Sequence, residues 1–235
     1  MSSYPQFSLL GASFYVTFLA LAGTTLLTFA ASVSPSLRDT ASNKQLQSAL
    51  LFENAINLIA SFMYSYFISD AKDGKLKTKE MMNIRYLDWL LTTPMLLLTL
   101  VYYLDYENRN KSTDPPQKLQ WPQIAAAIGF NVLMLLSGYL GESKRIPKAV
   151  GLATGFAAFY GIFKVLYDSY IKPYDDEQSK KLFAYFVCTW SLYGVFYMVP
   201  NETVKNLGYN ILDLLAKVGF GLYTVVTTID NSRGV

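Results

Sequence analysis

The chain has 235 residues, of which 52% are hydrophobic and only 16% are charged. Soluble proteins have about a quarter of their residues charged, and the 15% aromatic content argues against disorder. One cysteine and no histidine exclude an internal disulfide, Cys- or His-based metal sites, and Ser-His or Cys-His catalysis. The formal net charge of +3 is too small, and the basic residues too scattered, to favour nucleic-acid binding. We therefore expect neither a metal site nor nucleic acid as a partner.

Seven long windows almost free of charge follow one another along the chain. Each has about 19–24 residues, enough to cross the roughly 30 Å core of a bilayer as a helix at about 1.5 Å per residue. A soluble helical bundle would instead show polar faces at a spacing of about 3.6 residues, whereas windows such as 9–31 and 123–141 contain no charge at all. We predict an all-α bundle of seven transmembrane helices, forming one multi-pass membrane domain over residues 1–235 and surrounded by the lipid bilayer. The windows are 9–31, 46–69, 82–104, 123–141, 149–167, 182–200 and 206–229.

The orientation of the chain in the membrane does not follow from its charges. Seven spans place the two termini on opposite sides. Positively charged residues normally collect on the cytoplasmic side, but alternate connections carry nine Lys and Arg on one side and eight on the other. The first window has no basic segment before it and is about 23 residues long, so we read it as a mature span and not as a cleaved signal peptide.

Six ionisable residues lie inside the windows, where each costs several kcal/mol if it is unpaired. Lys164 lies close to the end of its window, where a lysine side chain reaches the interface. The other charges fall mainly into two i,i+3 or i,i+4 pairs, each on one helix face. These two pairs can neutralise one another as a purely structural cluster, although a desolvated lysine also loses its proton readily and then forms a Schiff base with a carbonyl. The six residues are Glu53, Arg85, Asp88, Lys164, Asp213 and Lys217.

Aromatic side chains are predicted to surround the charged pairs. Tyr86 and Trp89 flank Asp88, and an i, i+3, i+7 spacing places three more rings on one face of the sixth window. Such stripes are more often core packing than the wall of a ligand site. Two of them at the depth of a buried lysine favour a flat, conjugated ligand. The three rings of the sixth window are Trp190, Tyr193 and Tyr197.

The third and seventh windows resemble the corresponding helices of microbial (type 1) rhodopsins. The third reads RYLDWLLTTP from Arg85, and the seventh reads LDLLAKVGFG from Leu212. Shorter stretches in the second, fourth and sixth windows are also similar to bacteriorhodopsins and proteorhodopsins, so the resemblance covers all seven windows. It implies a light-driven ion transporter or photoreceptor, not an enzyme.

The resemblance also implies a cofactor and roles for the buried residues. All-trans retinal is expected as a Schiff base on Lys217, with Asp88 and Asp213 as counterions and Arg85 just outside them. Tyr86 is expected beside these groups. The polyene is expected between Trp89 and Trp190, with Tyr193 and Tyr197 completing the wall and Met134 and Gly138 near the retinal ring. The N-terminus is then extracellular and the C-terminus cytoplasmic.

The expected activity is outward proton transport, with one departure from the family's pattern. Asp88 is the expected proton acceptor and Thr92 its hydrogen-bond partner. Efficient outward pumps of the family carry a carboxylic donor where this chain has Thr99, whose hydroxyl does not ionise. Glu53 lies at a similar depth on the second helix. Our hypothesis is that Glu53 is buried, protonated in the dark and bonded to Thr99, because burial favours a neutral carboxyl. The alternative is a hydrated carboxylate at the cytoplasmic mouth.

Two other activities of the same fold stay open. A glutamate on the second helix also suits a light-gated cation channel, although this span contains only one. Slow reprotonation without a donor suits a sensory photoreceptor, yet no segment that would bind a transducer is legible. Members of the family commonly form homo-oligomers, trimers or pentamers, and the sequence does not choose between them.

Overall fold

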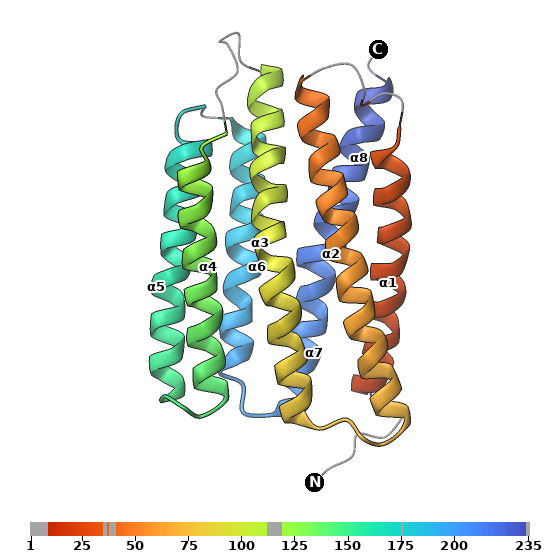
Figure 1. The fold of residues 1–235 in the computed structure, drawn as a ribbon, viewed down its shortest axis with the longest axis vertical. Coiled ribbons are helices and arrows are strands. Elements are labelled where there is room, and N and C mark those ends of the chain that lie inside the picture. Colours follow the sequence, from red (N-terminus) through yellow and green to blue (C-terminus); the bar gives the residue numbers. More distant parts are fainter. Residues whose placement is uncertain (1–8, 35–36, 38–40, 112–118, 175, 234–235) are drawn as a thin grey trace.

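The protein is a bundle of seven helical rods without strands among the residues that the structure describes, and a computed structural model gives its coordinates (Figure 1). The described residues are 9–34, 37, 41–111, 119–174 and 176–233. The last rod is continuous and contains α7, a short π-helical turn η3, and α8. The fifth rod ends in a similar turn, η2. The elements are α1 Leu9–Ser32, α2 Ala41–Lys72, α3 Thr78–Lys111, α4 Trp121–Glu142, α5 Lys148–Leu166, η2 Tyr167–Ile171, α6 Glu177–Tyr197, α7 Glu202–Asp213, η3 Leu214–Gly219 and α8 Phe220–Arg233.

Every predicted window lies largely within a rod, so the predicted fold class is confirmed. Within the described part of the chain, length and apolarity alone identify five rods that can cross a membrane, and these do not include α2 and α6. The reason is local composition. The middle of α2 carries Glu53 and Asn57, which are fully buried inside the bundle, and α6 begins with a polar turn that contains Glu177 and Lys180. A hydropathy criterion penalises polar groups that face the interior exactly as it penalises groups that would face lipid.

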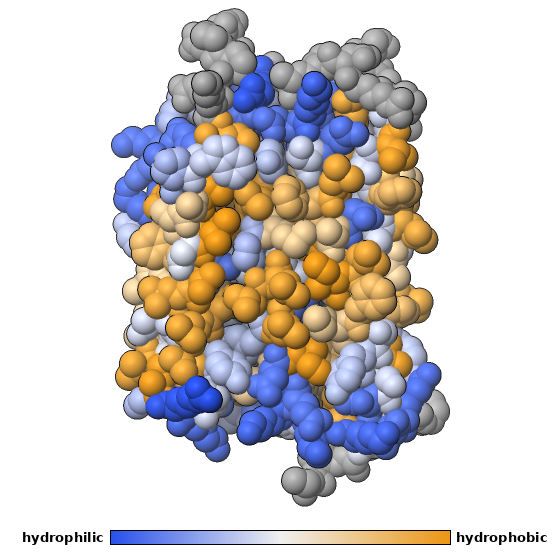
Figure 2. Space-filling view, viewed as in Figure 1, coloured by the Kyte–Doolittle hydropathy of each residue, from blue (hydrophilic) through white to orange (hydrophobic). Residues whose placement is uncertain are grey.

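The outer surface has the distribution of polarity that a bilayer requires. Apolar side chains form a broad band around the middle of the bundle, and hydrophilic side chains gather at both ends (Figure 2). Large apolar side chains in this band are exposed, including Leu19 at 66%, Phe62 at 67% and Tyr160 at 66%. Such a surface aggregates in water but is the ordinary lipid-facing surface of a membrane protein. The protein is therefore an integral membrane protein in a lipid bilayer.

The polar residues of the spans point inward, and α3 and the last rod carry most of them. In Figure 1, α3 crosses the centre of the view, and the last rod, in blue, is visible beside it and passes behind α2. Arg85 and Asp88 on α3 are each 3% exposed, and Asp213 and Lys217 on the last rod are each 1% exposed. The charged pairs thus meet in the interior of the bundle, away from its outer surface.

Candidate functional site

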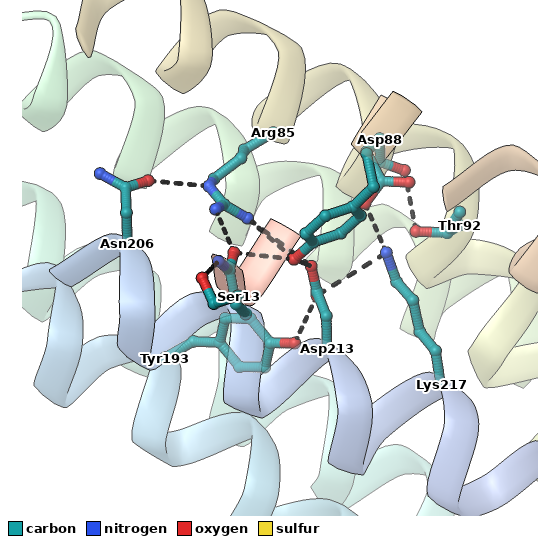
Figure 3. A network of polar contacts seen from close by, with 10 residues as sticks. Ser13, Arg85, Asp88, Thr92, Tyr193, Asn206, Asp213 and Lys217 are labelled. Carbon is teal, nitrogen blue, oxygen red and sulfur yellow. Dashed lines mark hydrogen bonds and ion pairs between the residues drawn. The ribbon is translucent and has the colours of Figure 1, made fainter. Parts of the chain in front are cut away.

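The centre of the site is Lys217, which lies in the π-helical turn η3. A π turn widens the helix by one residue and occurs mostly at functional positions. The Lys217 ammonium forms an ion pair and hydrogen bond with Asp88 Oδ2 and lies 3.7 Å from Asp213 Oδ1. Figure 3 shows Lys217 reaching from the last rod toward these two carboxylates. A buried ammonium is tolerated only with such partners.

Asp213 is fixed by groups from three other helices. Tyr64 on α2 donates to Asp213 Oδ2 at 2.7 Å, and Tyr193 on α6 donates to Oδ1 at 2.8 Å. Arg85 Nη1 on α3 lies 3.7 Å from Oδ2. Two hydroxyl donors and two cations make Asp213 a firmly held anion. In contrast, Asp88 Oδ1 has no hydrogen-bond partner among the described residues, so Asp88 retains a site for an additional hydrogen.

Arg85 is held just beyond the carboxylates by side-chain amides of α7. Arg85 Nε donates to Asn206 Oδ1 at 2.9 Å, and Nη2 donates to Asn210 Oδ1 at 2.5 Å. The guanidinium also lies over the rings of Phe67 and Tyr209, at 5.1 and 5.6 Å from their centroids. Two cations and two anions are therefore buried together with balanced charge, the arrangement that the spacing of the charged pairs predicts.

An aromatic cavity opens beside Lys217 and contains all eight residues that the sequence assigns to a ligand site. Trp89 packs edge-on against Tyr86 and Tyr193, with centroids 5.2 and 5.4 Å apart. A Cβ atom added to Gly138 would lie 2.7 Å from the Tyr86 hydroxyl, so a larger residue there would displace that ring. The eight predicted residues that line the cavity are Tyr86, Trp89, Met134, Gly138, Trp190, Tyr193, Tyr197 and Lys217.

The two predicted threonines both donate a hydrogen bond to a carbonyl group of their own helix. Thr92 donates its proton to the backbone carbonyl of Asp88 at 2.8 Å, and Thr99 donates to the carbonyl of Met95 at 3.0 Å. A helical threonine commonly bonds back to the preceding turn in this way. Each hydroxyl has one proton, which it gives to its own helix, and its oxygen can still accept a hydrogen bond. Thr92 therefore supports Asp88 through its backbone.

Glu53 is fully buried, which excludes a carboxylate in contact with solvent in this structure. The side chains of Thr99 and Asn57 both interact with the carboxyl group, and the charge of Lys217 acts on it. Asn57 Nδ2 lies 3.5 Å from Glu53 Oε2, whereas Oε1 has no hydrogen-bond partner among the described residues. Glu53 is thus buried beside Thr99, as the sequence predicts, and its protonation and its bond to Thr99 stay a prediction.

Sequence reasoning missed several residues of the site. Tyr64, Asn206 and Asn210 hold Arg85 and Asp213, and Tyr209 closes the cavity from the last rod. Tyr209, Asn210 and Asn206 lie four, three and seven residues before Asp213 and therefore share its helix face. This spacing could have predicted that they lie near Asp213. Glycines of α5 and α6 also line the cavity, and no pattern distinguishes them from packing glycines. They are Gly151, Gly155 and Gly194.

Comparison with known proteins agrees with this geometry. The family model described as "Bacteriorhodopsin-like protein" matches residues 11–231. Bacteriorhodopsin of Halobacterium salinarum is 29% identical over 153 residues, which is 59% of this chain and 53% of that protein. Archaerhodopsin-2 of Halobacterium sp. (strain aus-2) is 26% identical over 180 residues, or 69% of this chain and 64% of that protein. The matched part thus spans between half and two thirds of these curated relatives.

Solved structures give the same result over nearly the whole chain. The viral rhodopsin OLPVRII has a TM-score of 0.82 and 31% identity, with 95% of this chain and 99% of that chain covered. The rhodopsin of Exiguobacterium sibiricum shares the fold, with a TM-score of 0.73, 22% identity, and coverage of 95% and 96%. Together with a buried lysine–carboxylate centre inside seven helices, these matches place the chain in the bacteriorhodopsin-like family of microbial rhodopsins, which carry retinal as a Schiff base on a lysine.

Proposed function

We propose that the protein is a light-driven outward proton pump. The observation that carries the proposal is the placement of two buried carboxyl groups on opposite sides of Lys217 along the last rod. Asp88 pairs directly with the Lys217 ammonium. Glu53 lies against Gly221, one turn further along, where an added Cβ would be 3.3 Å from Glu53 Oε2. A proton acceptor and a proton donor on opposite sides of one nitrogen give transport a direction.

The residues around Lys217 fit retinal. The cavity is walled by Trp89, Trp190 and Tyr193, and Asp88 Oδ1 and Trp89 Nε1 are buried without a hydrogen-bond partner among the described residues. Retinal bound to Lys217 supplies a light-driven isomerisation that changes the surroundings of the proton on Nζ. Tyr193 and Trp89 would hold the ligand in one orientation, and Lys217 Nζ would carry the proton beside Asp88.

Asp88 is the proposed proton acceptor. It is the carboxylate in direct contact with Lys217 Nζ, and its second oxygen is free of competing hydrogen bonds among the described residues. Asp213 already accepts hydrogen bonds from Tyr64 and Tyr193 and lies 3.7 Å from Arg85. Asp88 is therefore the carboxylate that combines direct contact with Nζ and an open oxygen, and the proton is proposed to leave Nζ toward Asp88.

Glu53 is the proposed donor that returns a proton to Lys217 Nζ. Burial without a charged partner in hydrogen-bond contact favours a neutral carboxyl, which then has a proton to give. On the same helix, Leu46, Leu50 and Ile56 are also fully buried, so Glu53 lies within a buried stretch of α2. The donor position on α2 would take over the task that Thr99 on α3 is chemically unable to perform.

The direction of transport follows from the orientation inferred from the family, with the N-terminus extracellular and the C-terminus cytoplasmic. Asp88 then lies on the extracellular side of Lys217, and Glu53 on the cytoplasmic side. We also infer a homo-oligomer, trimer or pentamer, from the habit of the family.

Two rival activities of the same fold make different electrical predictions. Glu53, Asn57 and Ser61 lie at i, i+4 and i+8 on α2 and are all buried, and this polar stripe is the observation that favours a cation channel. The complete burial of Glu53 favours a pump. Under patch clamp, a pump gives a small current at zero gradient, a channel gives a current that reverses with the gradient, and a sensor gives none.

The decisive measurement is the sign of the light-induced pH change in cells supplied with retinal. We expect external acidification that a protonophore abolishes. External alkalinisation, whether a protonophore removes it or enlarges it, contradicts outward pumping. The Lys217→Ala variant serves as the control. It places a protein of the same size in the membrane but lacks the nitrogen on which the proposal depends.

A further inference from the structure

Two glutamates and a buried lysine meet at the end of the bundle where α4 ends and α7 begins, the lower end in Figure 1. The proposed orientation makes this end extracellular. Lys205, near the start of α7, is only 4% exposed. Its ammonium donates to Glu202 Oε1 at 2.8 Å and approaches both oxygens of Glu142, at 3.3 and 3.1 Å. The ammonium therefore lies between two carboxyl groups.

A second lysine balances the charge at this place. Lys148, at the start of α5, has its Nζ 3.5 Å from Glu142 Oε1 and 4.8 Å from the centroid of the Tyr197 ring. We call the four charged residues Glu142, Lys148, Glu202 and Lys205 the extracellular cluster. A buried ammonium is tolerated only beside compensating charge, so the burial of Lys205 favours the ionised form of both carboxyl groups.

The extracellular cluster lies in the wall of an open cavity that leads from the surface of the bundle toward Arg85. The cavity has a volume of about 1200 Å³, whereas a water molecule occupies about 30 Å³ in the liquid. Its wall includes Lys79 and Lys144, which are exposed, and Arg85, which is buried. Water therefore has room to reach from the medium to the guanidinium beside the Lys217 centre.

Two neighbouring carboxyl groups at such an exit behave in one of two ways. Without a cation between them, two close carboxylates repel each other, and the pair keeps one proton that it is able to give to the medium. With an ammonium between them, attraction to the cation replaces this repulsion, and neither carboxyl group has a proton to give. The geometry around Lys205 corresponds to the second case.

We propose that Lys205 is a positioning residue that keeps both carboxyl groups of the extracellular cluster ionised, so that the proton released in each cycle is the one that Asp88 received. This rests on the proposed role of Asp88 as acceptor. While Lys217 Nζ is neutral, Asp88 lacks its cationic partner and retains the proton. When Nζ regains a proton, its charge again stabilises the Asp88 carboxylate. The O–H bond of Asp88 then breaks and the proton passes to water in the cavity, so uptake precedes release.

Flash photolysis of purified, retinal-loaded protein with a pH-indicator dye measures the order of the two events. In the unaltered protein, we expect transient alkalinisation as Lys217 Nζ is reprotonated, followed by release with the recovery of the resting absorption. Lys205→Met keeps the length of the side chain and removes its charge, so the two carboxyl groups should then share a proton. Its release should coincide with the deprotonation of Nζ, and the first dye signal should change sign to acidification.

Lys75→Met is the matched control for this substitution. Lys75 pairs with Asp73 at the same end of the bundle, and its side chain is 70% exposed, so the order of uptake and release should be unaltered. Adding Glu202→Gln to Lys205→Met should abolish the early release, because the amide takes no part in a shared proton.

The order in the unaltered protein tests the inference even if Lys205→Met does not fold. Release that accompanies Nζ deprotonation, before uptake, overturns it. So does a carboxyl band in the light-induced infrared difference spectrum that appears with Nζ deprotonation and disappears in Glu202→Gln. Late release in a folded Lys205→Met variant that absorbs as the unaltered protein does would show that the lysine does not set the order.

Failure of the proposed function has a different signature. If Asp88 is not the acceptor, Nζ deprotonates at the unaltered rate in Asp88→Asn. If Asp88→Asn blocks Nζ deprotonation while the unaltered protein releases its proton early, the acceptor role stands and the inference about Lys205 is wrong.

Discussion

At the scale of single residues, the sequence allowed the charged centre to be predicted but not the polar groups that hold it. Arg85, Asp88, Asp213 and Lys217 stand out because a charge inside an apolar window requires a reason. Tyr64 and Asn210 support the same centre, yet tyrosine and asparagine occur throughout the spans and only tertiary packing selects these two. The hydroxyl protons of Thr92 and Thr99 go to carbonyl groups of their own helix, a competition that residue spacing alone does not reveal.

The absence of histidine has a residue-scale consequence. With no imidazole in the chain, the protonation of Asp88 depends on Lys217, Arg85 and Asp213 alone among its charged neighbours. Proton return likewise depends on carboxyl groups, because no other side chain inside the described spans releases a proton easily near neutral pH. Glu53, which is buried beside Thr99, is our candidate for the carboxyl group that returns the proton to Lys217.

Glu53→Gln tests this donor role directly. The amide keeps the size and the hydrogen bonds of the side chain but has no proton to transfer, so reprotonation of Lys217 Nζ should slow by about 10²-fold or more. Flash photolysis of the visible absorption measures this rate, and a small membrane-permeant weak acid should restore it. Glu177→Gln is the control. An unaltered rate in Glu53→Gln would show that the proton arrives by another route.

At the scale of the helices, the length and apolarity of the windows predicted the seven rods. The π turn of the last rod and the end of α3 depend on packing and were not predicted. The π turn that contains Lys217 leaves no mark in a hydrophobic pattern, because a single inserted residue does not disturb an apolar window. α3 continues to Lys111, well past the predicted end at 104, because Tyr103, Asp105 and Glu107 bury themselves against neighbouring helices. A predicted apolar window ends at the first charged residues, even where the helix continues and buries those residues inside the bundle.

Gly221→Ala tests how closely α8 approaches α2. An added methyl would meet Thr24 Cγ2 at 2.8 Å, Asn57 Nδ2 at 3.2 Å and Glu53 Oε2 at 3.3 Å. We expect a loss of about 1–3 kcal/mol in stability from overpacking, and slower proton return because the Glu53 carboxyl is displaced. Thermal bleaching and flash photolysis measure the two effects.

Gly23→Ala is the matched control for this substitution. An added Cβ there meets no atom within 4 Å, and alanine is favoured over glycine inside a helix by about 1 kcal/mol. Its thermal stability should be unchanged or slightly higher, and its photocycle unaltered. Equal behaviour of the two variants would mean that the contact between α8 and α2 does not position Glu53.

At the scale of the whole molecule, orientation is the property that composition leaves open. Basic residues are divided nine to eight between the two sides, and the bundle has hydrophilic side chains at both ends (Figure 2). Because outward transport requires Glu53 to face the cytoplasm, the proposed function depends on an orientation that only the family resemblance supplies. The orientation therefore needs a test that does not involve light.

Cysteine labelling provides that test, because the chain has a single cysteine, Cys188. In a Cys188→Ser background, Lys79→Cys places an exposed thiol at the start of α3, and Glu177→Cys places one at the start of α6, at the opposite end of the bundle. With the N-terminus outside, a membrane-impermeant maleimide should label the Lys79→Cys variant on intact cells. It should label Glu177→Cys only after permeabilisation. The reverse pattern would place Asp88 on the cytoplasmic side of Lys217, and the same residues would then move protons inward.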